Sequence, residues 1–227
     1  MTIRLTNEQA SKGVTHLGWR YVLGAFVCYV PVDSFSDGAE LAGRVAAAAG
    51  ALADEHVKVD LRADGVIITV QTFTSGWTTT DDLDLVHRIT TGLQEEGRQA
   101  TPHDNQPTRS VQILEIAIDA MDIGAIRPFW KAAMGYADEG DRNGPRDPLV
   151  DPLAQGPAIW FQQMDAPRPQ RNRIHFDISV PHDEAEPRMA AIVAAGGKLV
   201  SDRAPAFWVF ADPEGNEACI TTWQGRD

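Results

Sequence analysis

Two short stretches of the chain carry residue types that can do chemistry. Residues 173–180 read Arg-Ile-His-Phe-Asp-Ile-Ser-Val, and the strict alternation of a half-buried strand puts the His, Asp and Ser on one face. A row of these three residue types suits a concave, partly enclosed surface better than a solvent-facing strand. Residues 212–220 read Asp-Pro-Glu-Gly-Asn-Glu-Ala-Cys-Ile, which predicts a turn followed by a strand. The sequence therefore predicts that His175 and Glu217 point into one cavity.

Length and composition describe a globular protein with room for two domains. The 227 residues suit two domains of about 100–120 residues each. With 43% hydrophobic and 23% charged residues, the chain has enough apolar material for packed cores. The two cysteines, Cys28 and Cys219, lie far apart on apolar-rich strands, which indicates two buried thiols rather than a disulfide or a metal clip.

The net charge of the chain argues against one class of partner. A formal net charge of -12 argues against nucleic acid, because a phosphate-binding surface needs clustered Lys and Arg. A small-molecule substrate or another protein is the expected partner. No apolar run approaches the roughly 20 residues of a membrane span, and the first residues lack the pattern of a signal peptide. We therefore expect no membrane association and a cytoplasmic protein.

The first hundred residues follow the order helix, two strands, helix, two strands, helix. An Asp-Gly step between two apolar alternations predicts one of the hairpins, and Asp33 or Ser34 can cap the second helix. The pattern predicts an α+β layer, a four-stranded antiparallel sheet with helices on one face. The expected elements are a helical turn at 7–12, strands at 15–23 and 25–32, a helix at 33–54, strands at 57–61 and 66–72, and a helix starting within 78–82.

This order, together with Trp19 and the steps Glu55-His56-Val57 and Thr72-Phe73, resembles the pterin-4a-carbinolamine dehydratase family across residues 19–96. That family uses a His-His-Pro step and a further Thr-His step, and imidazole is suited to proton transfer near neutral pH. Here only His56 of those histidines is present. The resemblance thus implies a vestigial pterin site at Glu55, His56 and Phe73. The alternative is that Glu55 and His56 form a new acid–base pair.

A boundary follows this domain. Residues 97–110 contain two prolines and almost no apolar residue, which is typical of a solvated linker. We expect one domain over 1–98, a linker over 99–110 and a second domain over 111–227.

The second domain repeats the pattern strand, helix, three strands. Two β-α-β-β-β units of similar length form an internal repeat, which predicts a pair of half-sheets around a cup. The expected elements are 113–119, 122–134, a short strand near Tyr136 and 158–164 in the first unit, and 174–180, 183–195, 198–202, 206–211 and 217–223 in the second.

Five motifs in this domain carry a second resemblance: Asp122 leading into Phe129-Trp130, then Met134-Gly135-Tyr136, Trp160-Phe161-Gln162, and residues 172–177 and 212–217. Over residues 111–223 the chain resembles the vicinal oxygen chelate superfamily, and most closely its glyoxalase-like branch. In that superfamily the metal ligands come from the first and fourth strands of each unit. Carried over by position, they fall on Glu115, Gln162, His175 and Glu217.

These ligands imply a chemistry. One imidazole, two carboxylates and an amide oxygen suit a divalent ion such as Zn, Ni, Co, Mn or Fe with open positions for substrate. Such an ion can chelate neighbouring oxygens and stabilise an enediolate after proton abstraction by Glu115 or Glu217. Oxygen activation is disfavoured, because Glu115 stands where ring-cleaving relatives would have a His. The resemblance therefore implies a glyoxalase-like, metal-dependent lyase or isomerase.

Around the ligands, Asp119 and Asp177 lie on the polar faces of their strands, and Trp160 and Trp208 offer aromatic surface of the kind that small-molecule pockets use. These four are the predicted substrate-binding residues. Two other functions stay open: a metal-free small-molecule binding or sequestration protein, and a pterin-related dehydratase that uses His56. Both resemblances imply a homodimer.

Overall fold

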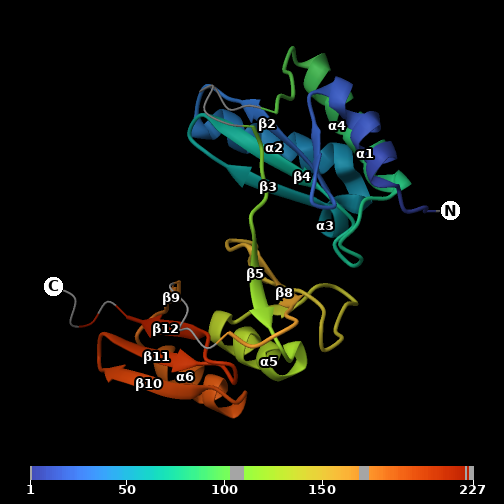
Figure 1. Cartoon of the computed structure of the whole chain (residues 1–227). Coiled ribbons are helices and arrows are strands. Elements are labelled where there is room, and N and C mark those ends of the chain that lie inside the picture. Colours follow the sequence, from blue (N-terminus) through green and yellow to red (C-terminus); the bar gives the residue numbers. More distant parts are fainter. Residues whose placement is uncertain (1, 103–109, 169–173, 223, 225–227) are drawn as a thin grey trace. The chain divides into compact units, whose positions relative to one another are not determined.

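The computed structural model describes residues 2–102, 110–168, 174–222 and 224. The chain divides into two compact units, Met1–Ile113 and Leu114–Asp227 (Figure 1). Most of the expected linker at 99–110, and Arg173 of the first motif, lie outside the described residues. None of the described helices has the length and apolar composition that a membrane span requires.

The N-terminal unit is a four-stranded antiparallel sheet in the order β1-β2-β4-β3. The predicted α+β fold is confirmed. Its strands are β1 (Arg20–Val22), β2 (Ala25–Pro31), β3 (Val57–Leu61) and β4 (Gly65–Val70). Its helices are α1 (Asn7–Val14), α2 (Phe35–Ala49), α3 (Ala53–His56) and α4 (Thr80–Glu95), with 3-10 turns at Thr15–Leu17 and Gly50–Leu52.

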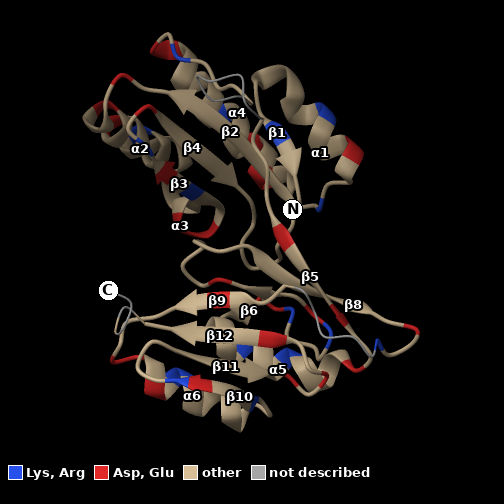
Figure 2. Ribbon diagram, turned by 60° about the vertical axis from the view of Figure 1, so that its left-hand side comes forward, with Lys and Arg blue, Asp and Glu red and all other residues tan. Residues whose placement is uncertain are grey.

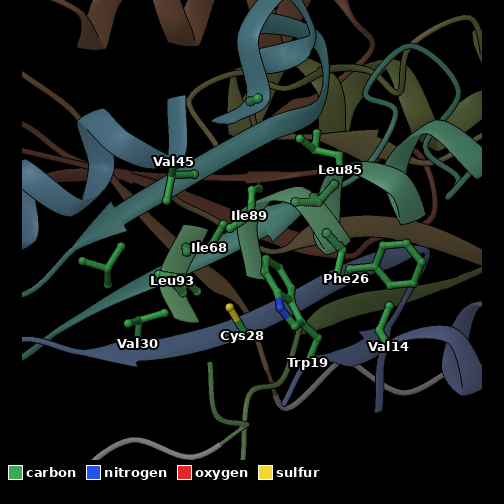
Figure 3. Close-up of a cluster of buried hydrophobic side chains, with 14 of the residues drawn as sticks. Val14, Trp19, Phe26, Cys28, Val30, Val45, Ile68, Leu85, Ile89 and Leu93 are labelled. Atoms are coloured by element: carbon green, nitrogen blue, oxygen red, sulfur yellow. The ribbon is translucent and has the colours of Figure 1, made fainter. Parts of the chain in front are cut away.

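One face of this sheet carries the core, which Figure 3 shows. Phe26 pairs with Val70 and Cys28 with Ile68, so these side chains share the face that the helices cover. Trp19 is fully buried among them, and its indole N–H donates to the Thr90 hydroxyl on α4 at 3.0 Å. The thiol of Cys28 is buried as expected, and burial raises its pKa.

The two largest differences from the expected boundaries both occur at a glycine. The strand expected from residue 15 begins only at Arg20, because the chain continues from α1 into a 3-10 turn that ends at Gly18, where φ is 86°. The helix expected to reach residue 54 ends at Ala49, because Gly50 adopts a φ of 60°. Glycine takes positive φ at little cost, so it stops both segments.

The C-terminal unit contains two four-stranded sheets, β5-β8-β7-β6 and β9-β12-β11-β10, and so has the expected internal repeat. In each sheet the first strand of the repeat is an edge strand and pairs in parallel with the last one. The first repeat consists of β5 (Glu115–Ala120), α5 (Ile123–Met134), β6 (Ala137–Asp138), β7 (Leu149–Val150) and β8 (Ala158–Gln163). The second consists of β9 (Phe176–Ser179), α6 (Ala185–Ala194), β10 (Lys198–Arg203), β11 (Phe207–Ala211) and β12 (Glu217–Thr221).

Helix α5 is held at both ends by residues of the second repeat. At its start, the Glu214 carboxylate accepts hydrogen bonds from the backbone N–H groups of Met121 (2.8 Å) and Asp122 (2.6 Å). At its end, Arg188 on α6 donates to the carbonyl of Ala133 at 3.1 Å. These contacts use the backbone groups that a helix leaves without intrahelical partners. They fix the two repeats relative to each other.

Candidate functional site

The pairing of β12 with β9 brings two predicted ligands alongside each other. Ala218 pairs with Phe176 and Cys219 with Asp177, so one residue earlier His175 lies beside Glu217. The His175 side chain is 51% exposed, and its Nε2 lies 3.5 Å from Oδ1 of Asp177, which is 59% exposed. The predicted polar face, with His175, Asp177 and Glu217 on one side of these strands, is thus present in the structure.

The pairing of β5 with β8 separates the other two predicted ligands. Glu115 lies opposite Ala158, whereas Gln162 lies opposite Asp119, four residues further along the strands. At about 3.3 Å per residue, this offset places Glu115 and Gln162 about 13 Å apart along the sheet. Their side chains share a face but do not approach one point.

Within the described residues, the four predicted ligands therefore do not converge on one point. Among the residues that the structure describes, no three His, Cys, Asp or Glu side chains lie close enough to hold an ion. The residue types suit a divalent metal, but their positions in a single chain do not fit one.

Glu115 lies at the start of β5, and its surroundings shift the pKa of its carboxyl group. Burial raises the pKa of its carboxyl group, the nearby Glu139 carboxylate raises it further, and Arg142 opposes both effects. A carboxyl group with a raised pKa is better suited to proton transfer near neutral pH than an ordinary one.

The C-terminal unit has a cavity of about 720 Å3 between the edge strands β5 and β9. This volume is in the range of small-molecule sites. Acidic residues lie on β5, β9 and β12 in Figure 2, and those of β5 and β12 that reach the cavity are Asp119 and Glu217. The lining residues are Ile116, Ala117, Ile118, Asp119, Met121, Trp130, Met164, Pro167, Arg168, Ile174, Phe176, Glu214, Gly215, Asn216 and Glu217.

The second motif of the sequence builds one wall of this cavity. Asp212 accepts hydrogen bonds from the backbone N–H groups of Glu214 and Asn216 (2.9 Å each) and from the indole N–H of Trp130 at 3.0 Å. The turn at 212–216 is therefore tied to α5 and places Glu217 at the start of β12. Its acidic residues act first as structural groups, which the sequence alone did not indicate.

The predicted substrate-binding residues differ in their positions relative to the cavity. Asp119 lines the cavity, where its carboxylate lies 3.1 Å from the guanidinium of Arg168. Trp160 lies on the same face of the sheet and is 36% exposed, but it does not line the cavity. Asp177 faces His175 outside it. Trp208 does not match the prediction, because it shares a face with the fully buried Ile220 and packs against the core.

Several cavity residues were not predicted as site residues, among them Trp130, Phe176, Met121 and Arg168. Trp130 and Phe176 contact each other edge to face with ring centroids 5.5 Å apart. Both were expected only as apolar residues of a helix and a strand. The cavity depends on the position of β5 relative to β9, which no local sequence pattern specifies.

In the N-terminal unit, the predicted vestigial pterin site is a closed polar cluster. His56 Nδ1 lies 2.7 Å from Oδ1 of Asp82, and the two side chains are 7% and 0% exposed. The other Asp82 oxygen accepts hydrogen bonds from the hydroxyl groups of Thr72 (2.7 Å) and Thr79 (2.8 Å). His56 is thus committed to a buried network that caps α4.

The other two residues of that predicted site lie beside this cluster. Glu55 is exposed. The ammonium group of Lys58 lies over the Phe73 ring, 4.7 Å from the ring centroid, in a cation–π contact. Neither residue contacts His56 through its side chain in any hydrogen bond or ion pair that the described structure contains. We find no acid–base pair between Glu55 and His56.

Comparison with known proteins finds a similarity in the C-terminal unit. The family model of the glyoxalase-like domain matches residues 115–221. This part of the chain is similar to the glyoxalase-like domain family. No curated protein sequence is significantly similar to the chain.

Three solved structures illustrate the similarity. Hypothetical protein SA1046 from S. aureus is 15% identical over 50% of this chain and 95% of its own, with a TM-score of 0.40. A glyoxalase/bleomycin resistance protein/dioxygenase family enzyme from Burkholderia phytofirmans PsJN is 18% identical over 48% and 95%, with a TM-score of 0.38. A mutant of the fosfomycin resistance protein FosX from Listeria monocytogenes, in complex with Mn(II) and 1S,2S-dihydroxypropylphosphonic acid, is 12% identical over 50% and 90%, with a TM-score of 0.39.

Proposed function

We propose that the glyoxalase-like domain binds a small organic molecule in the cavity between β5 and β9. The observation that carries this proposal is the cavity itself, about 720 Å3 in volume and lined by both apolar and polar side chains. This combination is typical of small-molecule sites, in which apolar surface supplies affinity and a few polar groups supply orientation. Ile118 and Trp130 form the apolar part, and Asp119, Arg168 and Glu217 supply polar groups.

Binding of the neutral dye Nile red, followed by its fluorescence, tests this proposal. Ala117 lines the cavity, whereas Ala158 on the neighbouring strand does not. We expect the wild-type protein to bind the dye, Ala117→Phe to weaken binding roughly tenfold or more by occupying the cavity, and Ala158→Phe to bind as wild type. Equal binding by all three proteins would place the dye elsewhere and contradict the proposal.

A metal-dependent lyase or isomerase reaction is our second candidate. It is favoured by the adjacent positions of His175 and Glu217 in a glyoxalase-like domain and by the raised pKa of Glu115. Because one chain does not gather the ligands, this candidate requires donors from another chain. We therefore couple it to a homodimer that contributes residues of two copies to one site.

Metal analysis combined with light scattering tests the second candidate. We expect a dimer with stoichiometric divalent metal for the wild type, and loss of metal with the dimer intact for His175→Ala and Glu217→Ala. A monomer, or equal trace metal in all three proteins, contradicts this candidate and leaves the cavity proposal standing.

A further inference from the structure

We infer that Asp212 is a positioning residue of the cavity, which sets the affinity for a ligand without touching it. The inference rests on the proposed binding function and adds a residue that controls it. Asp212 is 2% exposed and does not line the cavity, but its carboxylate holds lining residues of both repeats. These are Trp130 on α5 of the first repeat and the turn at 214–216 of the second.

Each oxygen of the Asp212 carboxylate accepts two hydrogen bonds. Oδ1 accepts from the backbone N–H groups of Glu214 and Asn216, at 2.9 Å each. Oδ2 accepts from the indole N–H of Trp130 at 3.0 Å and from the side-chain amide of Asn216 at 2.8 Å. Hydrogen bonds to a carboxylate are stronger than those between neutral groups. One side chain thus joins the helix of one repeat to the turn of the other.

The position of Trp130 depends on this contact. The residue is 1% exposed, and its ring contacts the lining residue Phe176 edge to face, with 5.5 Å between the ring centroids. A buried N–H group without an acceptor is unfavourable, so the ring would have to move if Asp212 no longer accepted from it. Because interiors are closely packed, movement of Trp130 also displaces Phe176. The cavity therefore changes shape when this hydrogen bond is lost.

The turn makes a second connection between the same two segments. The Glu214 carboxylate accepts a hydrogen bond from the backbone N–H of Met121 at 2.8 Å, and Met121 lines the cavity. The backbone bonds from Glu214 and Asn216 to Asp212 hold the turn that carries this carboxylate. Asp212 therefore supports both connections, directly through Trp130 and indirectly through Glu214.

Nile red binding to Asp212→Asn tests the inference with little change of side-chain volume. Because both carboxylate oxygens accept from N–H groups, an amide must turn its NH2 group toward two donors in either orientation. We expect the folded variant to bind the dye about fivefold or more weakly than the wild type. Tyr136→Phe is the matched control and should bind as wild type. It removes one hydrogen bond, to the carbonyl of Pro157, from a residue of the same unit that is 8% exposed and does not line the cavity.

A double variant tests whether Asp212 acts through Trp130. In a Trp130→Phe background the indole donor is absent, so Asp212→Asn should weaken dye binding less than it does in the wild-type background. A residue that only stabilised the fold would lower stability and leave the affinity of the folded protein unchanged in both backgrounds.

The indole N–H signal of Trp130 in proton–nitrogen NMR spectra gives a second readout. Its assignment follows from the signal that disappears in Trp130→Phe. Because this N–H is bonded to Asp212 and its ring lines the cavity, the signal of the wild-type protein should shift when Nile red binds.

The possible results separate the inference from the function beneath it. Wild-type affinity of folded Asp212→Asn, or an equal loss of affinity in the two backgrounds, overturns the inference and leaves the cavity as a binding site. Circular dichroism establishes that the variant is folded. If it is not, the NMR titration of the wild type decides, and a Trp130 signal that the dye does not shift overturns the inference. Dye binding that is insensitive to Ala117→Phe overturns the proposed function, and the inference with it.

Discussion

The two units each contain a His–Asp pair, and the pairs differ in almost every physical respect. His56 and Asp82 come from segments 26 residues apart, lie 2.7 Å from each other and are 7% and 0% exposed. His175 and Asp177 are neighbours on one strand face, lie 3.5 Å apart and are 51% and 59% exposed. The same two residue types thus form an internal support in one unit and an accessible polar surface in the other.

The comparison shows that residue type alone does not distinguish a structural group from a site. A buried pair with further hydrogen bonds resists replacement, because removing one partner leaves the others without partners in a medium of low dielectric. An exposed pair exchanges its contacts with water at little cost. Mutations that measure these free-energy costs test the contrast.

The largest effect is expected for Asp82→Ala. The substitution removes the Asp82 half of the capping box of α4 and leaves His56, Thr72 and Thr79 without this acceptor, which should lower the free energy of unfolding of the N-terminal unit by about 3–5 kcal/mol. Hydrogen exchange measured by mass spectrometry reports on each unit separately. The exposed Asp84 on the same helix is the control, and Asp84→Ala should change stability by less than about 0.5 kcal/mol. Similar values for the two variants would remove the contrast.

Glu214→Gln should have an intermediate effect, because this polar residue of the C-terminal unit serves a structural role. Loss of its charge at the start of α5 should lower the free energy of unfolding of that unit by about 1 kcal/mol, as for other helix caps. Glu184→Gln is the matched control, since Glu184 is the N-cap residue of α6 and makes no side-chain capping bond. Urea unfolding of both variants measures the difference, and an unchanged Glu214→Gln protein would contradict the structural role.

Glu115→Gln should give a small effect of opposite sign. The folded state raises the pKa of this carboxyl group, chiefly by burial, so folding disfavours its ionised form. Replacement by Gln should therefore slightly stabilise the protein at neutral pH, and the gain should vanish as the pH falls below the ordinary pKa of a carboxyl group. Thermal unfolding across this pH range checks the sign. A variant that is less stable at neutral pH than at acid pH, relative to wild type, would refute it.

The smallest effect is expected for His175→Ala, which should change the free energy of unfolding by less than about 0.5 kcal/mol, because the side chain is half exposed and its contact with Asp177 is long. Urea unfolding of this variant completes the series. A loss comparable to that of Asp82→Ala would mean that the outer pair is as structural as the inner one.

The sequence predicted the fold well because most of its signals are local. The alternation in β9 and the apolar stripe of α5 each specify an element, and Gly135, with a φ of 68°, ends α5 where expected. The 3-10 turn at Thr15–Leu17 was missed, because the alternation of apolar residues there continues without interruption into β1.

The candidate site was predicted only in part, because its geometry depends on register. Local alternation correctly assigned Glu115 and Gln162 to one sheet face, but the pairing of β5 with β8 decides that they lie about 13 Å apart along the strands. Similarly, the pattern around Trp208 does not say which side of β11 faces the core. The cavity arises where two edge strands face each other without pairing, and its residues are far apart in the sequence.

Because α5 is attached at both of its ends to the second repeat, the two repeats depend on each other for stability. Although the duplicated halves look like two copies of one building block, the first borrows the carboxylate of Glu214 and the guanidinium of Arg188 from the second to complete its helix. A polypeptide cut after residue 168 would lose both contacts and keep only the helix's own caps at Asp122 and Gly135, so each half should be less stable alone than in the pair. Duplication here has produced interdependence rather than modularity.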